Sequence, residues 1–158
     1  MTSLKAPMPW PISTRRFLMT GLVFLGAAVA VSLLPGDYST DIFLHDKYFV
    51  LPMPHLIWSA ALLCGILALL CGLVGLVDGT ASRSRCHKLH FWFSVGGMCA
   101  VVGSLLLAAV RGQQGDPSMM HVFLLFALGG IFAFAVGQLI LLFSAIHGLV
   151  KSLRRAVA

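Results

Sequence analysis

The stretch MPHLIWSAALLCGILALLCGLVGLV, Met53 to Val77, decides the fold class of this chain. It contains no Asp, Glu, Lys or Arg, and it is longer than the roughly 20 apolar residues that a helix needs to cross ~30 Å of hydrocarbon. Backbone polar groups inside a bilayer must be satisfied within the segment, as they are in an α-helix. The stretch therefore predicts a membrane-spanning α-helix.

Three more segments of this kind lie along the 158 residues, of which 59% are hydrophobic and only 10% are charged. They are Phe17 to Leu34, Phe91 to Val110 and Met119 to Leu149. A soluble surface needs more charge than this composition offers, so we predict an integral membrane protein. Short connections make successive helices neighbours. We expect an all-α membrane protein whose four transmembrane helices form an antiparallel bundle.

Basic residues fall mainly on one side of the predicted bundle. Only Lys47 and Arg111 fall on the other side, together with four of the five acidic residues. The nine basic residues of the first side are Lys5, Arg15, Arg16, Arg83, Arg85, Lys88, Lys151, Arg154 and Arg155. Cytoplasmic loops carry the excess of Lys and Arg, so we expect both termini in the cytoplasm. The net charge of +6 then reflects topology and attraction to anionic lipid, and it requires no nucleic-acid partner.

This topology divides the chain into three parts. Residues 1–16 are expected to form a cytoplasmic N-terminal segment, residues 17–150 a four-helix transmembrane domain, and residues 151–158 a basic cytoplasmic tail. Glycines are dense within the predicted spans, and small residues let membrane helices approach closely. The glycines that predict close helix packing are Gly96, Gly97, Gly103, Gly129, Gly130 and Gly137.

The first external loop ends in the stretch DIFLHDKYFVLPMPH, Asp41 to His55. It holds two of the six histidines, two of the five acidic residues and two of the seven prolines. Proline fits the first turn of a helix, whereas in the interior it removes a hydrogen bond and clashes with the preceding turn. We therefore expect the second helix to begin near Pro52, Tyr48 to Leu51 to be extended or distorted, and His55 to lie in the first turn near the outer interface.

Three motifs resemble subunit I of the haem–copper oxidases, the catalytic subunit of cytochrome c and quinol oxidases. HDKYFVLPMPH, His45 to His55, is similar to the family's H-D-T-Y-[FY]-V-V-A-H-F-H, and the overlapping DIFLHD is similar to its D-I-x-L-H-D. KLHFWFSVGG, Lys88 to Gly97, resembles K-[IL]-H-F-W, and QLILLFSAIHGLVKSLRRA, Gln138 to Ala156, resembles the end of the last helix. From about residue 17 the chain looks like the last four helices of that subunit.

The resemblance implies roles for residues of the external stretch. His45 and Asp46 match a pair that contributes to a magnesium or manganese site near the outer surface. His55 matches the axial ligand of the low-spin haem, and Met53 stands where the family has the axial histidine of the oxygen-binding haem. Residues two apart on a helix point about 200° apart, so one family helix serves two haems. This chain keeps a histidine on one side only, and methionine does not suit an iron that must bind oxygen.

Other interpretations of these residues stay open. A His-Asp pair is also common loop polarity, since Mg²⁺ needs more oxygen ligands than the pair supplies. A histidine near a helix end is also common at the membrane interface. A rim of His and Met at the outer face would suit copper. The residues of that possible rim are His45, Met53, His55, Met119, Met120 and His121.

The resemblance implies a respiratory membrane component that does not reduce oxygen on its own. In the family, the copper ligands and the second axial ligand of the low-spin haem lie on earlier helices, which have no counterpart here. We expect a non-catalytic or haem-binding protein of the bacterial inner (cytoplasmic) membrane, with other oxidase subunits or a second copy of itself as partner. The alternative is an assembly factor, a scaffold or a degenerate oxidase fragment that binds no haem.

Overall fold

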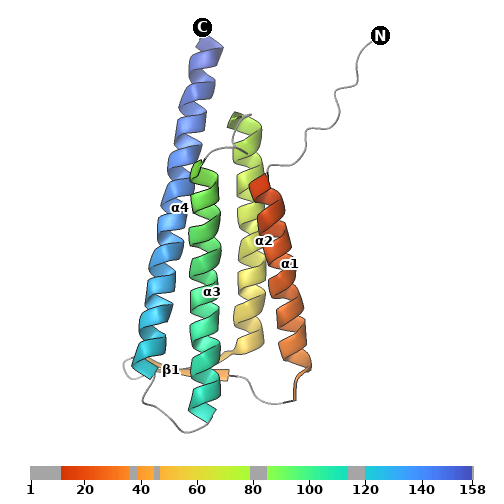
Figure 1. The fold of residues 1–158 in the computed structure, drawn as a ribbon, viewed down its shortest axis with the longest axis vertical. Helices are drawn as coiled ribbons and strands as arrows, with labels where there is room; N and C mark the ends of the chain where they lie inside the picture. Colours follow the sequence, from red (N-terminus) through yellow and green to blue (C-terminus); the bar gives the residue numbers. More distant parts are fainter. Residues whose placement is uncertain (1–11, 36–38, 45–46, 79–84, 114–119, 158) are drawn as a thin grey trace.

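The computed structural model describes residues 12–35, 39–44, 47–78, 85–113 and 120–157, and long helices dominate it (Figure 1). The helices are α1 (Ile12–Leu33), α2 (Met53–Asp78), α3 (Arg85–Gln113) and α4 (Met120–Val157). Each of the four is long and apolar enough to cross a membrane. Four candidate spans therefore stand where the sequence predicted them.

The helices are longer than the apolar segments that predicted them. α1 begins at Ile12, α3 begins at Arg85, and α4 continues to Val157. Helical hydrogen bonds form in water as well as in lipid. The charged residues that flank an apolar segment can therefore belong to the same helix. The expected boundaries after residues 16 and 150 consequently fall inside α1 and α4 and not at helix ends.

A β-hairpin precedes α2, which corrects the all-α prediction. Strands β1 (Ser39–Leu44) and β2 (Lys47–Pro52) pair in antiparallel register, from Ser39 opposite Pro52 to Leu44 opposite Lys47. Both strands are rich in the aromatic and β-branched residues that favour strands. The expectation that the chain is extended before the second helix is confirmed, and α2 begins at Met53, directly after Pro52.

The four helices run side by side, with α1 and α3 pointing one way in Figure 1 and α2 and α4 the other. The hairpin lies at the end where α2 and α4 begin, and we call this the hairpin end. We call the opposite end, where α1 and α3 begin and α4 terminates, the basic end.

Helix contacts divide the bundle into two pairs. α1 packs mainly on α2, and α3 packs mainly on α4, while α2 and α4 connect the pairs. α2 and α3 make few contacts although they follow each other in the chain, so the expectation that successive helices are neighbours is wrong for them. The physical reason is that the closest glycine-mediated approaches described lie within the pairs, at Gly21 against α2 and at Gly97 against α4.

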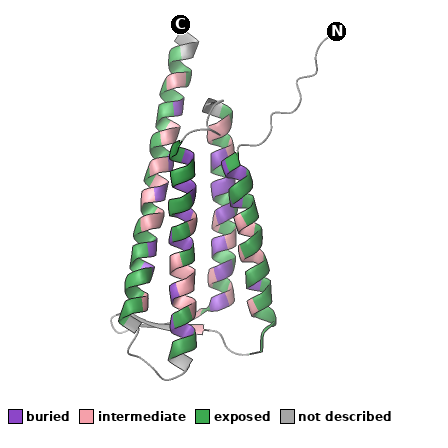
Figure 2. Cartoon of the chain, in the orientation of Figure 1, coloured by how far each residue is buried: buried purple, intermediate pink, exposed green. Residues whose placement is uncertain are grey.

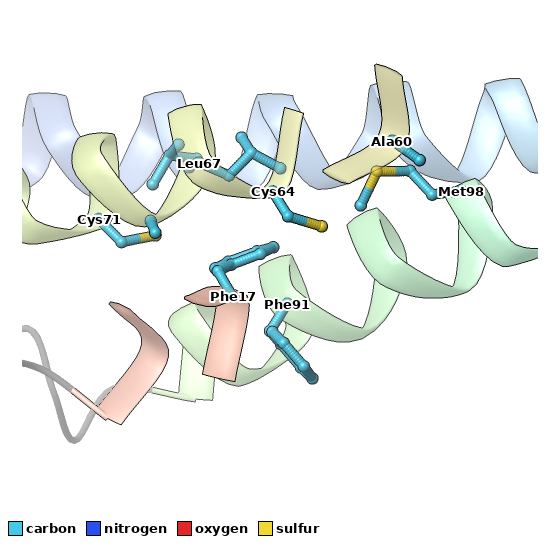
Figure 3. Close-up of a cluster of buried hydrophobic side chains, with 9 residues drawn as sticks. Phe17, Ala60, Cys64, Leu67, Cys71, Phe91 and Met98 are labelled. Atoms are coloured by element: carbon cyan, nitrogen blue, oxygen red, sulfur yellow. The ribbon is translucent and has the colours of Figure 1, made fainter. Parts of the chain in front are cut away.

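The core between the two pairs is small and tightly filled (Figure 3). The Phe17 ring of α1 packs edge-on against the Phe91 ring of α3, with centroids 5.0 Å apart. Cys64 and Cys71 of α2, seven residues apart on one face, are both fully buried as free thiols. Leu141 of α4 belongs to the same buried cluster, so all four helices contribute to this core.

Exposed positions run along all four helices (Figure 2), and many of them carry large apolar side chains. Val23, Phe132 and Phe143 are each more than 70% exposed. A monomer in water rarely exposes continuous apolar surface on this scale. This surface is the one expected of helices in contact with lipid.

Glycines set the distance between α3 and α4. A Cβ added to Gly97 would lie 2.5 Å from the Gly130 carbonyl oxygen, and one added to Gly130 would lie 2.7 Å from the Gly97 carbonyl oxygen. Gly96 and Gly129 face open space and line a groove of about 430 Å³. The prediction of close packing is thus confirmed for Gly97 and Gly130 and wrong for Gly96 and Gly129.

Candidate functional site

His55, the predicted haem ligand, lies in the first turn of α2 at the hairpin end and is exposed. Its backbone carbonyl accepts a hydrogen bond of 2.8 Å from the Ser59 hydroxyl one turn later. Met53, two residues earlier, is fully buried. The two side chains therefore differ completely in environment, as the 200° between such positions requires.

Local sequence explains this placement. Pro52 ends β2, and a helix that begins at Met53 holds Pro54 in its first turn, where proline costs no hydrogen bond. The first turn then presents Met53 to the protein interior and His55 to the surroundings. Met53 is therefore not part of the exposed surface on which His55 lies, and the copper hypothesis stays a prediction.

The other predicted ligands are only partly described. His121 is exposed in the first turns of α4, at the same end of the bundle as His55. The predicted pair His45 and Asp46, together with Met119, lies outside the described residues. Within the described part of the chain, no group of three His, Cys, Asp or Glu side chains could hold a metal ion.

A low-spin haem needs two strong axial ligands and an apolar pocket around its ring. His55 offers one imidazole, and it is exposed instead of enclosed. The described residues of one chain thus fit half of a haem site and not a closed one. A second axial ligand and a cover for the haem ring are not formed by His55 and its described neighbours on α2.

A network of buried polar side chains near the basic end joins α3 to α4. His90 of α3 is fully buried, and its Nδ1 lies 2.8 Å from the carbonyl oxygen of Gly137 in α4. Because a carbonyl oxygen only accepts, Nδ1 carries the proton. The Ser94 hydroxyl oxygen lies 3.2 Å from the same nitrogen and is a second acceptor for its N–H, so the hydrogen bond is bifurcated.

The network continues along both helices. The Gln138 side-chain amide donates to the Ser94 hydroxyl at 3.0 Å, and the Ser144 hydroxyl lies 3.3 Å from Nε2 of the buried His87. These contacts connect the first turns of α3 to the second half of α4. This network is not among the predictions made from the sequence. The available signal was the spacing of His87, His90 and Ser94, which places all three on one face of a helix.

α1 closes this network from the side. The Phe17 ring lies 5.3 Å from the His90 ring, centroid to centroid, and Thr14 one turn earlier is fully buried. Nε2 of His90 and the Thr14 hydroxyl have no hydrogen-bond partner among the described residues. The network can orient an imidazole and fix three helices together. None of its described members is an acid that could act as a proton donor or acceptor beside the imidazole.

The two places lie at opposite ends of the bundle. His55 belongs to the hairpin end, and His90 belongs to the basic end. His87 and His90 therefore cannot share a ligand with His55, since a bilayer of ~30 Å separates the ends of a spanning helix.

Comparison with protein-family models, with curated proteins and with solved structures found no match to this chain. The likeness to haem–copper oxidase subunit I therefore rests on the sequence motifs alone.

Proposed function

We propose that this chain is a non-catalytic, multi-pass membrane component related to haem–copper oxidase subunit I. It works by lateral contact with another membrane subunit or with a second copy, and it contributes His55 to a haem held at that contact. The observation that carries the proposal is the first turn of α2, where His55 is exposed while Met53, at the position of the family's oxygen-binding haem ligand, is buried.

The orientation belongs to the same proposal. The nine-to-two division of basic residues supports an orientation with both termini, and therefore the basic end, in the cytoplasm. His55 then lies at the outer face of a bacterial inner membrane. The two long helix pairs of an antiparallel bundle leave a wide apolar surface for the partner.

Two features support a role without oxygen chemistry. The imidazole on the oxygen-binding side is replaced by a methionine that packs inside the protein. His55 is the remaining histidine in register with a family haem ligand, and neutral imidazole is the side chain best suited to low-spin iron. No step of oxygen reduction is assigned to this chain.

The test is a haem spectrum of the protein purified in mild detergent from haem-replete cells. We expect low-spin absorbance bands in the wild type, and their loss in His55→Ala with oligomer size unchanged. The matched control is His147→Ala, an exposed histidine of α4 near the basic end, which should leave the spectrum unaltered.

Two results would contradict the proposal. If His55→Ala keeps haem with an unaltered spectrum, His55 is not the ligand. If the wild type contains no haem under these conditions, the haem contact is wrong and the alternative holds, namely an assembly factor, a scaffold or a degenerate fragment of an oxidase.

A further inference from the structure

The end of α4 extends past the other three helices at the basic end (Figure 1). α4 has 38 residues, so it is about 57 Å long. A bilayer including its headgroups is about 40–45 Å thick. With α4 starting at the outer headgroups, roughly its last eight residues stand beyond the inner headgroups in water.

An apolar stripe begins at the level of the inner headgroups and continues into this extension. Ile146, Val150 and Leu153 are 51%, 43% and 58% exposed, and Leu149 beside them is 53% exposed. Ile146, Val150 and Leu153 are spaced four and three residues apart, which are the spacings of successive d, a and d positions in a coiled-coil seam. Val150 and Leu153 belong to the part of α4 that stands beyond the headgroups, where another protein element can cover them.

Charge identifies the kind of element. Lys151, Arg154 and Arg155 lie in the same extension, and no acidic residue follows Asp116 anywhere in the chain. Arg154 takes the position beside the seam that forms ion pairs across a coiled coil. A second copy in the same orientation would bring the same cations and repel, whereas an acidic helix would be attracted.

We propose that the α4 extension, together with the turn before it (residues 146–157), is a docking helix for an acidic amphipathic helix of a partner protein on the cytoplasmic side. The partner would cover the stripe of Ile146, Val150 and Leu153 with its own apolar seam and would set Glu or Asp beside Arg154. This inference rests on the orientation given under the proposed function, but not on haem or on kinship with oxidases.

The test uses the full chain in nanodiscs of phosphatidylcholine, which offers no anionic lipid. The probe is a fluorescent synthetic helix with Leu at its a and d positions and Glu at its e and g positions, titrated into the millimolar range and followed by anisotropy. We expect saturable binding that weakens with salt, because the flanking ion pairs are screened. A probe with Gln in place of every Glu should bind less tightly.

Variants of the chain locate the contact. Val150→Ser with Leu153→Ser should weaken binding by at least about tenfold, since central apolar anchors dominate such contacts. Ser152→Ala, on an exposed position outside the seam, is the matched control and should bind like the wild type. Arg154→Gln should weaken binding of the Glu probe and leave binding of the Gln probe unchanged.

Several outcomes would overturn the proposal. One is no binding, or equal binding by the serine variant and the control. Another is a solvatochromic dye on Leu153→Cys that reports a lipid environment before any probe is added, which would assign the stripe to the membrane. A third is spontaneous disulfide dimers of Leu153→Cys, which would assign it to a second copy. Failure of the haem experiment would leave this test unaffected.

Discussion

Side chains that carry hydrogen-bonding groups in these apolar helices mostly satisfy them locally. The hydroxyls of Thr20, Ser32 and Ser59 each donate to a carbonyl one turn earlier, at 2.8–2.9 Å. This arrangement removes the cost of placing a polar group in lipid. Ser94 and Ser144 differ from these residues, because their hydroxyls make contacts that connect two helices.

The contact between Ser94 and Gln138 is expected to contribute measurably to stability. In a double-mutant cycle of Ser94→Ala and Gln138→Leu, we expect a coupling of about 0.5–1.5 kcal/mol, the usual range for a hydrogen bond between membrane helices. The measurement is unfolding by SDS in mixed micelles. The control cycle pairs Ser94→Ala with Ser104→Ala, because Ser104 bonds to Ala100 in its own helix. Coupling in the control, or additivity in the test pair, would contradict the network.

At the residue scale, the sequence predicted the position of some side chains but not the contacts of others. His55 was placed in the first turn of α2 because proline restricts where a helix can begin, and that restriction is local. The partner of His90 lies 47 residues away in α4, so the contact depends on how two helices align. Nothing in the sequence near His90 fixes that alignment.

Each helix was predictable as an element because a run of apolar residues of sufficient length has one stable form in lipid. The hairpin was not, since its strands are short and each gains stability only by pairing with the other. The sequence also did not predict that α2 packs on α4 more than on α3. This packing depends on which helix faces carry glycines that contact a neighbouring helix, and the sequence does not show where those faces point.

The seam between α3 and α4 gives a direct test at the scale of elements. Gly97→Ala places a Cβ against the backbone of Gly130 and Phe134, so we expect a loss of about 1–3 kcal/mol of stability. Gly96→Ala in the neighbouring position meets open space and should be neutral or stabilising by up to about 1 kcal/mol, since alanine favours helix. Both are measured by SDS unfolding. Equal effects of the two substitutions would contradict the close approach.

The whole molecule has two chemically different ends joined by an apolar bundle. The hairpin end carries the exposed His55 and His121, and the basic end carries the buried His90 network and the α4 extension. The proposed roles of the two ends depend on which end faces the cytoplasm. The distribution of basic residues predicts that it is the basic end.

Cys86 provides a native reporter of this orientation, because it is an exposed free thiol in the first turn of α3. In intact bacterial cells, a membrane-impermeant maleimide should leave Cys86 unlabelled, and it should label Cys86 once the membrane is permeabilised. In a Cys86→Ser background, Ser39→Cys in β1 should be labelled in intact cells, with Cys86→Ser alone as the blank. Labelling of Cys86 in intact cells, with Ser39→Cys labelled only after permeabilisation, would contradict the orientation and with it the placement of His55 at the outer face.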